Sequence, residues 1–238
     1  MNMKFTLFFC SILLLSIFIR IYHLTSVPPA LHGDELGVGY NAYSLLKTGK
    51  DEYGRFLPLT FRSDFTPLIF YSTIPFVALL GLTEFATRFP TALIGVFTVP
   101  AVYLLVYELT RLKKLALLTM CLVGLSSWHI RTSRIALELT WALFFQIVAV
   151  TFFLRSLRFG RSNLIISFFF FGISIFSYHS TKMTTPLLLI SLLVIYKQQV
   201  KKIVSLKILI LLFCLSIILH ILLYVKVQAF SQIRFVGI

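Results

Sequence analysis

The stretch FTLFFCSILLLSIFIRIYHL, residues 5–24, decides the class of fold to which this chain belongs. A predominantly apolar segment of this length, wound into a helix, crosses the hydrocarbon core of a bilayer, which is about 30 Å thick. Lys4 precedes it, as in a signal peptide, but it lacks a small-residue cleavage site and more apolar segments follow. We therefore predict a retained signal anchor.

The composition extends this conclusion to the whole chain. Of its 238 residues, 58% are hydrophobic and 16% aromatic, and the mean hydropathy is +0.94. A water-soluble domain of this size carries far fewer apolar residues. Because helices satisfy their own backbone hydrogen bonds in lipid, the sequence predicts an all-α, polytopic transmembrane helix bundle that forms one membrane domain, residues 1–238.

The formal net charge of +14 raises the question of nucleic-acid binding. The basic residues, however, fall in small clusters between apolar segments rather than along one face, so we expect no nucleic-acid partner. The positive-inside rule instead places these clusters in the cytoplasm. The clusters are Arg111/Lys113/Lys114, Arg155/Arg158/Arg161 and Lys197/Lys201/Lys202/Lys207.

These charges fix the predicted topology. If residues 66–82 crossed the membrane, the basic clusters would become extracytoplasmic, so we predict that this segment, with Pro67 and Pro75, lies in the outer interface. The map then has seven spans, with the C-terminus outside. They are residues 5–24, 88–110, 115–128, 139–154, 163–178, 184–196 and 206–225. The outer connections are a long first loop with interfacial helices (25–87), a second loop (126–138), the turn 177–182 and the tail after Tyr224.

The first outer loop holds six of the eight acidic residues, among them the adjacent Asp34 and Glu35 in LHGDELGVGY. Apolar and aromatic residues recur behind them at helical spacing, and Gly49 stands where a helix C-cap is expected. Two interpretations of Asp34 stay open. It is a favoured N-cap, with Glu35 in the first turn suiting the helix dipole; or its second oxygen faces a cavity, as an ionised carboxylate that accepts a hydroxyl proton.

Several basic residues are expected on the same outer side, where positive charge is normally sparse. Taken singly, each is explained by snorkelling to the interface. Together they indicate a site for an anionic headgroup. These residues are Arg88, Arg131, Arg134 and Lys182, with Arg20 as a further contributor. The histidines lack ligand spacing, so the sequence predicts no metal site.

Five motifs in fixed order carry a resemblance to a known family: R-x-Y at residues 20–22, PPALHGDE at 28–35, TPLIFY at 66–71, EFATRFPTALIG at 84–95 and WHIRTSR at 128–134. In this order they resemble the N-terminal half of the protein O-mannosyltransferase and lipid A aminoarabinose transferase group. Those proteins are GT-C membrane glycosyltransferases that use a dolichyl- or polyprenyl-phosphate sugar donor. The resemblance covers about residues 20–186.

The resemblance implies roles for particular residues. Asp34 corresponds to the catalytic base, with Glu35 as its neighbour, and Arg88 to the arginine that begins the next span. Glu138 is the nearest match to an acidic residue of the second outer loop, where the family more usually has Asp. The family's His-Pro-Pro pattern is replaced here by residues 64–67, DFTP. Since members carry more spans and a further C-terminal portion, we expect this chain to be a truncated N-terminal part.

The sequence thus predicts a mannosyltransferase-like glycosyltransferase of the cell (plasma or inner) membrane, with its active site on the extracytoplasmic face. It would move a sugar from polyprenyl phosphate to an acceptor hydroxyl of a protein, lipid or cell-envelope glycan, with inversion. No cofactor is expected, because Arg88, Arg131, Arg134 or Lys182 would neutralise the phosphate. The alternatives are a transporter or lipid flippase, which would carry its charges near the membrane midplane, and a catalytically inactive fragment.

Overall fold

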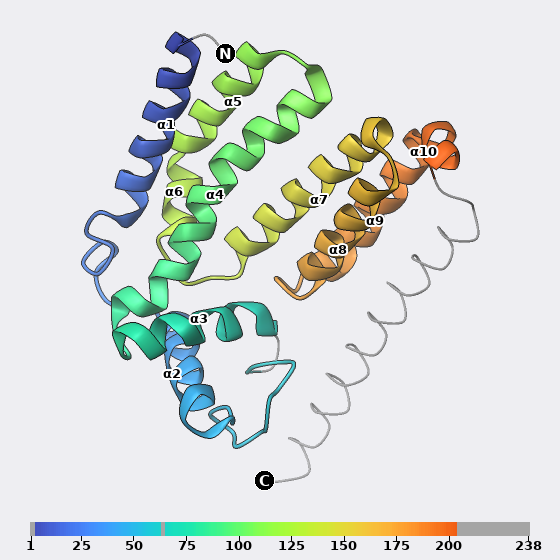
Figure 1. Ribbon diagram of the computed structural model, residues 1–238. Helices are drawn as coiled ribbons and strands as arrows, with labels where there is room; N and C mark the ends of the chain where they lie inside the picture. Colours follow the sequence, from blue (N-terminus) through green and yellow to red (C-terminus); the bar gives the residue numbers. More distant parts are fainter. Residues whose placement is uncertain (1–2, 63–64, 204–238) are drawn as a thin grey trace.

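The computed structural model describes residues 3–62 and 65–203, and within these ranges the fold is all-α, as predicted. Figure 1 shows the helices as a bundle with two further helices at one end. The β-bridges in this part of the chain are two isolated ones, Lys50 with Phe56 and Phe61 with Phe65. The helices are α1 (Met3–Ile21), α2 (Gly33–Thr48), α3 (Pro67–Leu80), α4 (Glu84–Thr110), α5 (Lys113–Leu125), α6 (Ser127–Ser133), α7 (Leu139–Phe159), α8 (Arg161–Ile175), α9 (Thr181–Ile195) and α10 (Lys197–Ile203).

Three of these helices, α1, α4 and α7, are long and apolar enough to cross a membrane. Two bent pairs raise the number to five if each counts as one span: α5 with α6, bent by 59°, and α9 with α10, bent by 88°. Each of the first six predicted spans coincides with one helix, from α1 to α9. The seventh, residues 206–225, and the tail after it lie outside the described residues, so the count of seven stays a prediction.

Helix α3 lies across the end of the bundle beside α2 (Figure 1). At 1.5 Å per residue its 14 residues span about 21 Å, close to the lengths of α5 and α9, so its position across the end of the bundle, rather than its length, separates it from the spans. Its buried face, with Ile69 and Phe70, packs against Val38 and Leu45 of α2. This is the arrangement expected of a segment that lies at an interface rather than crossing the bilayer.

The junctions that carry the basic clusters lie at the opposite end of the bundle from α2, α3 and α6 (Figure 1). Here Glu108 near the end of α4 forms ion pairs with Arg111 and with Arg155 of α7. The acid-rich loop and the basic clusters are therefore separated by the length of the helices, which agrees with the separation that the charge pattern predicted.

The centre of the bundle is α4, which contacts α1, α5, α6 and α7. A close approach is possible because α4 presents small residues to its neighbours, as is common where helices pack in lipid. Gly95 is the tightest point: a Cβ placed there would lie 2.2 Å from the Cβ of Ser133. No residue but glycine fits, so α6 is held directly against α4.

The topology is testable by labelling with a membrane-impermeant thiol reagent. Lys50 and Lys113 are both exposed but lie at opposite ends of the bundle (Figure 1). In a background with the three native cysteines replaced by alanine, Lys50→Cys should be labelled in intact cells and Lys113→Cys only after the membrane is opened. The parent without an introduced cysteine is the control, and the reverse labelling pattern would overturn the assignment of sides.

Candidate functional site

Helix α2 begins two residues earlier than the sequence indicated, and this changes the role of Asp34. The N-cap is His32, whose side chain accepts a hydrogen bond from the Asp34 backbone nitrogen, while the Glu35 side chain accepts from the His32 backbone nitrogen. The predicted N-cap role of Asp34 is therefore wrong, because the His32 imidazole takes the position that an Asp side chain would fill. At the other end, Gly49 is the C-cap in the left-handed conformation, as predicted.

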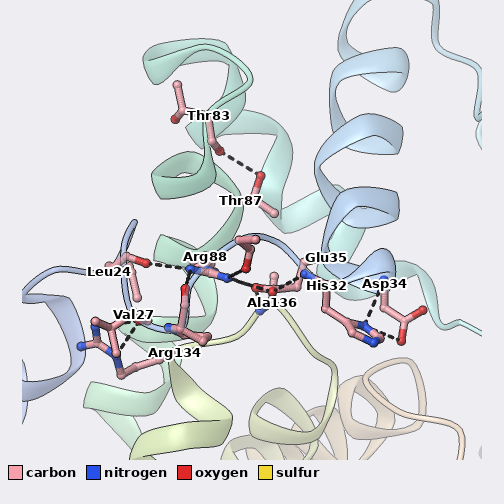
Figure 2. A network of polar contacts seen from close by, with 12 residues as sticks. Leu24, Val27, His32, Asp34, Glu35, Thr83, Thr87, Arg88, Arg134 and Ala136 are labelled. Carbon is pink, nitrogen blue, oxygen red and sulfur yellow. Dashed lines mark hydrogen bonds and ion pairs between the residues drawn. The ribbon is translucent and has the colours of Figure 1, made fainter.

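The Asp34 carboxylate is consequently not committed to the helix terminus. Figure 2 shows it pointing away from the Glu35 carboxylate, beside the His32 ring. Its side chain is 40% exposed, with one oxygen 3.5 Å from His32 Nδ1 and the other 4.0 Å from Arg62 Nη1. Asp34 thus retains a carboxylate that a ligand can reach.

Glu35 lies in the opposite environment, fully buried against Arg88. Arg88 Nε and Nη2 donate to the two carboxylate oxygens at 2.8 and 3.0 Å, and the backbone nitrogens of Ala136 and His32 add one bond to each oxygen. Burial alone would raise the pKa of Glu35, but these four bonds outweigh it and lower the pKa below its ordinary value. Glu35 is held as a carboxylate with its acceptor sites in use.

The remaining N–H groups of Arg88 bind the connection between α1 and α2. Nη1 donates to the carbonyls of Leu24 and Pro28, and Nη2 donates to that of Ala30 at 2.6 Å (Figure 2). Together with the two bonds to Glu35, these contacts use all five N–H groups of the guanidinium. A phosphate contact from Arg88, as expected from the sequence, would require one of these bonds to break.

Arg134 holds the same connection from the other side. Its guanidinium donates to the carbonyls of Tyr22 and His23, where α1 ends, and to that of Val27. The last carbonyls of a helix lack intrahelical partners, so a buried arginine there supplies the missing donors. Arg134, which is 7% exposed, is committed to the backbone in the same way as Arg88.

Arg20 is the third buried arginine, and it supports the break between α5 and α6. It donates to the carbonyl of Gly124 at 3.1 Å and contacts His129 Nδ1 at 2.7 Å. Snorkelling, the alternative for arginines at a membrane edge, does not describe Arg20, Arg88 or Arg134, because all three are buried. Their guanidinium groups donate hydrogen bonds to backbone carbonyls instead.

Arg131 and Lys182 are the predicted cations that stay free. Arg131 is exposed and Lys182 is half-buried, and among the residues that the structure describes neither side chain has a hydrogen bond or ion pair. Arg131 faces a cavity of about 910 Å³, which we call the α2–α6 cavity. Its walls are residues 27–32, Asp34 and Glu35 on one side and Ser127, Ile130, Arg131, Arg134, Ile135 and Leu137 on the other.

The chemistry of the α2–α6 cavity is mixed. Most of the wall is apolar, formed by the two prolines at 28 and 29 and by Leu31, Ile130 and Leu137. The partly exposed Asp34 supplies a negative charge, and Arg131, which has no hydrogen bond or ion pair to the described residues, supplies a positive charge. A volume of this size accepts a molecule of several tens of atoms, and an apolar wall with one free cation suits a lipid that carries a phosphate.

Glu138 lies in a separate buried position just before α7, where it receives the N-terminus of α3. One of its oxygens accepts from both the backbone nitrogen and the hydroxyl of Thr66, each at 2.5 Å. Burial raises the pKa of Glu138 to about 7, against the opposing effect of the Thr66 bonds and of Lys182. The charge of Asp34 also raises this pKa, so the fold brings Asp34, Glu138 and Lys182 within electrostatic reach.

One residue beside the site was not among those expected from the sequence. Arg62 donates to Glu52 at 3.0 Å and to the carbonyl of Gly33, next to Asp34. Its guanidinium lies against Gly37, where an added Cβ would be 2.5 Å from Cζ. The guanidinium fits at this position because glycine has no side chain. The sequence does not distinguish Arg62, because the same loop also holds Lys47, Lys50 and Arg55. Asp64, which follows Arg62, lies outside the described residues.

Comparison with known proteins gives one match. The family model described as dolichyl-phosphate-mannose-protein mannosyltransferase matches residues 10–235 of the chain. Comparisons with curated proteins and with solved structures gave no match.

The buried ion pair predicts a large loss of stability on truncation of one partner. Arg88→Ala leaves Glu35 charged and buried and removes donors from three carbonyls, so it should lower the free energy of unfolding by about 3–5 kcal/mol. Replacing both partners, by Glu35→Gln with Arg88→Met, should cost less than Arg88→Ala, because no unpaired charge stays behind. Unfolding in detergent, followed by circular dichroism, measures both.

The exposed Arg131→Ala is the matched control for the loss of an arginine and should leave the unfolding transition in place. If Arg88→Ala unfolded like the wild type but lost donor binding, Arg88 would be a phosphate ligand, as the sequence indicated, rather than a structural residue.

Glu138 predicts a pH dependence of stability. Its pKa is about 7 in the folded chain against an ordinary 4.5, so folding favours the protonated form. The stabilising contribution is complete below pH 4.5 and is lost as the pH rises through 7. Glu138→Gln keeps an oxygen that accepts from Thr66 but cannot titrate. The thermal midpoint of this variant should therefore vary less with pH between 4.5 and 7 than that of the wild type. A midpoint that falls equally in the wild type and the variant would show that another group titrates.

Proposed function

Since the chain belongs to the dolichyl-phosphate-mannose-protein mannosyltransferase family, we propose that it transfers one sugar from a polyprenyl-phosphate donor to an acceptor hydroxyl at the end of the bundle that carries α2 and α3. Membership makes it a glycosyltransferase and a multi-pass membrane protein. The observation that carries the proposal is the difference between the two adjacent acids. Glu35 is fully buried and has its acceptor sites filled, whereas Asp34 is 40% exposed at the wall of the α2–α6 cavity and has only longer contacts, 3.5 Å to His32 and 4.0 Å to Arg62.

The α2–α6 cavity fits the donor. Its apolar wall lies against the α1–α2 connection, where the first prenyl units would contact Pro28, Pro29 and Ile130. Arg131 is the free cation within the cavity, and its planar fork suits two oxygens of one phosphate. Arg88 and Arg134 hold the wall in place but leave the phosphate to Arg131, with Lys182 as a second cation nearby.

Asp34 is the base of the proposed reaction. Its carboxylate takes the proton of the acceptor hydroxyl while the hydroxyl oxygen attacks the anomeric carbon of the sugar. The bond from that carbon to the phosphate oxygen breaks on the opposite face, so the configuration inverts. Polyprenyl phosphate leaves with one additional negative charge, which Arg131 stabilises. The protein cations carry this charge, and the scheme uses no cofactor.

Glu35 and Glu138 take supporting roles in this scheme. Glu35 has its acceptor sites filled by Arg88 and two backbone nitrogens, so it sets the position of Asp34 rather than sharing its task. Glu138, with its raised pKa, exchanges a proton near neutral pH and lies within electrostatic reach of Asp34. Its protonation state therefore changes the charge close to the proposed base.

Asp34→Asn tests the proposal directly. Asp34 does not cap α2 through its side chain, so the amide should leave the fold intact while it removes the base. Transfer of labelled mannose from polyprenyl-phosphate mannose to a serine peptide should fall by about 10²–10⁴-fold, measured with protein purified from its native membrane. The unfolding midpoint should not change.

Arg131→Ala in the same assay should lower kcat/KM for the donor roughly tenfold, about 1.4 kcal/mol. Arg161→Ala removes an exposed arginine at the other end of the bundle and should leave transfer unchanged. Near-normal transfer by Asp34→Asn would eliminate Asp34 as the base, and an equal effect of Arg131→Ala and Arg161→Ala would eliminate Arg131 as the phosphate ligand.

A further inference from the structure

A second cavity, which we call the α2–α4 cavity, opens on the other side of the first turn of α2. It has a volume of about 460 Å³ and lies between α2, the first turn of α4 and the loop that carries Glu52 and Arg62. None of the roles assigned above uses it. Its position relative to Asp34 nevertheless connects it to the proposed reaction.

Two residues link the cavities. Leu31 lines both of them. Arg62 lines the α2–α4 cavity, and its Nη1 lies 4.0 Å from Asp34 Oδ1. Asp34 lines the α2–α6 cavity, and its contact with Arg62 places it next to the α2–α4 cavity. Displacement with inversion needs the attacking oxygen and the leaving phosphate on opposite faces of the sugar, so an acceptor is expected to arrive from the side away from Arg131.

The charges of the α2–α4 cavity differ from those of the α2–α6 cavity. Glu52 is paired with Arg62 at 3.0 Å, so these two charges compensate each other. Glu84, in the first turn of α4, is exposed and has no hydrogen bond or ion pair from its side chain to any residue that the structure describes. The cavity thus carries one uncompensated negative charge, which disfavours a lipid phosphate and favours a cation.

The walls offer contacts for a polypeptide as well as a charge. Leu36, Tyr40 and Leu82 are about half exposed there, and the charged side chains of Glu52 and Arg62 lie beside them. Thr87 also lines the cavity, but it is buried and its hydroxyl donates to the Thr83 carbonyl. Exposed leucine and tyrosine next to hydrogen-bonding groups are the kind of surface that binds an extended segment. Charge and surface together point to a peptide with a basic side chain.

We infer that the α2–α4 cavity is the acceptor subsite: it holds the residues beside the reactive serine or threonine, and Glu84 selects segments with a lysine or arginine next to that hydroxyl. The inference rests on the proposed function, because it assigns the acceptor of the same transfer. Glu84 contacts neither the sugar nor the phosphate in this arrangement, so its replacement should change acceptor choice and leave donor use as it was.

The test compares three serine peptides that differ only in the neighbouring residue, which is lysine, glutamine or glutamate. The wild type should prefer the lysine peptide over the glutamate peptide roughly fivefold in kcat/KM, the size expected of exposed charge pairs. Glu84→Gln should bring this ratio close to one, and Glu84→Lys should reverse it. High salt should shrink the preference of the wild type.

Lys47→Gln changes one charge on α2 outside the cavity and is the control, with the wild-type ratio expected. Transfer without a charge preference, or a preference that Glu84→Lys leaves intact, would overturn the subsite while the proposed transfer stands. Failure of the wild type to modify any of the three peptides would overturn the proposed function and the subsite together.

Discussion

The buried ion pair between Glu35 and Arg88 is the interaction on which the rest of this site depends. Removing both charges from water carries a large desolvation free energy. Hydrogen bonds to every acceptor and donor of the pair offset it. Through the pair, α2 is fixed to α4, to the connection that follows α1 and to the backbone at Ala136. One interaction therefore sets the relative positions of three segments that are far apart in the sequence.

Burial gives opposite roles to adjacent residues of the same charge. Asp34 and Glu35 follow each other at the start of α2, and successive residues of a helix point in directions about 100° apart. Glu35 points toward α4, where Arg88 balances its negative charge. Asp34 points toward the cavity and keeps a partly exposed carboxylate. The same division applies to the basic residues. Arg134, the C-cap of α6, binds backbone carbonyls, whereas Arg131 in the last turn of α6 does not.

The two cavities lie on different sides of the first turn of α2 and differ in charge. The α2–α6 cavity combines an apolar wall with Arg131, and the α2–α4 cavity combines half-exposed side chains with Glu84. In the proposed reaction, charges of opposite sign on the two sides would separate an anionic lipid from a cationic peptide before either reached Asp34. The first turn of α2 is thus both the wall between the substrates and the source of the carboxylate.

The sequence by itself determined the all-α membrane fold, six of the helices at predicted spans, the helix after Asp34 with its cap at Gly49, and the separation of the basic clusters from the acidic loop. These follow from local composition, periodicity and charge, which a single chain displays. The tertiary structure alone decided the capping by His32, the commitment of Arg20, Arg88 and Arg134 to buried carbonyls, and the position of Arg62. Which partner a long charged side chain finds depends on segments that are distant in the sequence, because burial and hydrogen bonding are set only when those segments pack together.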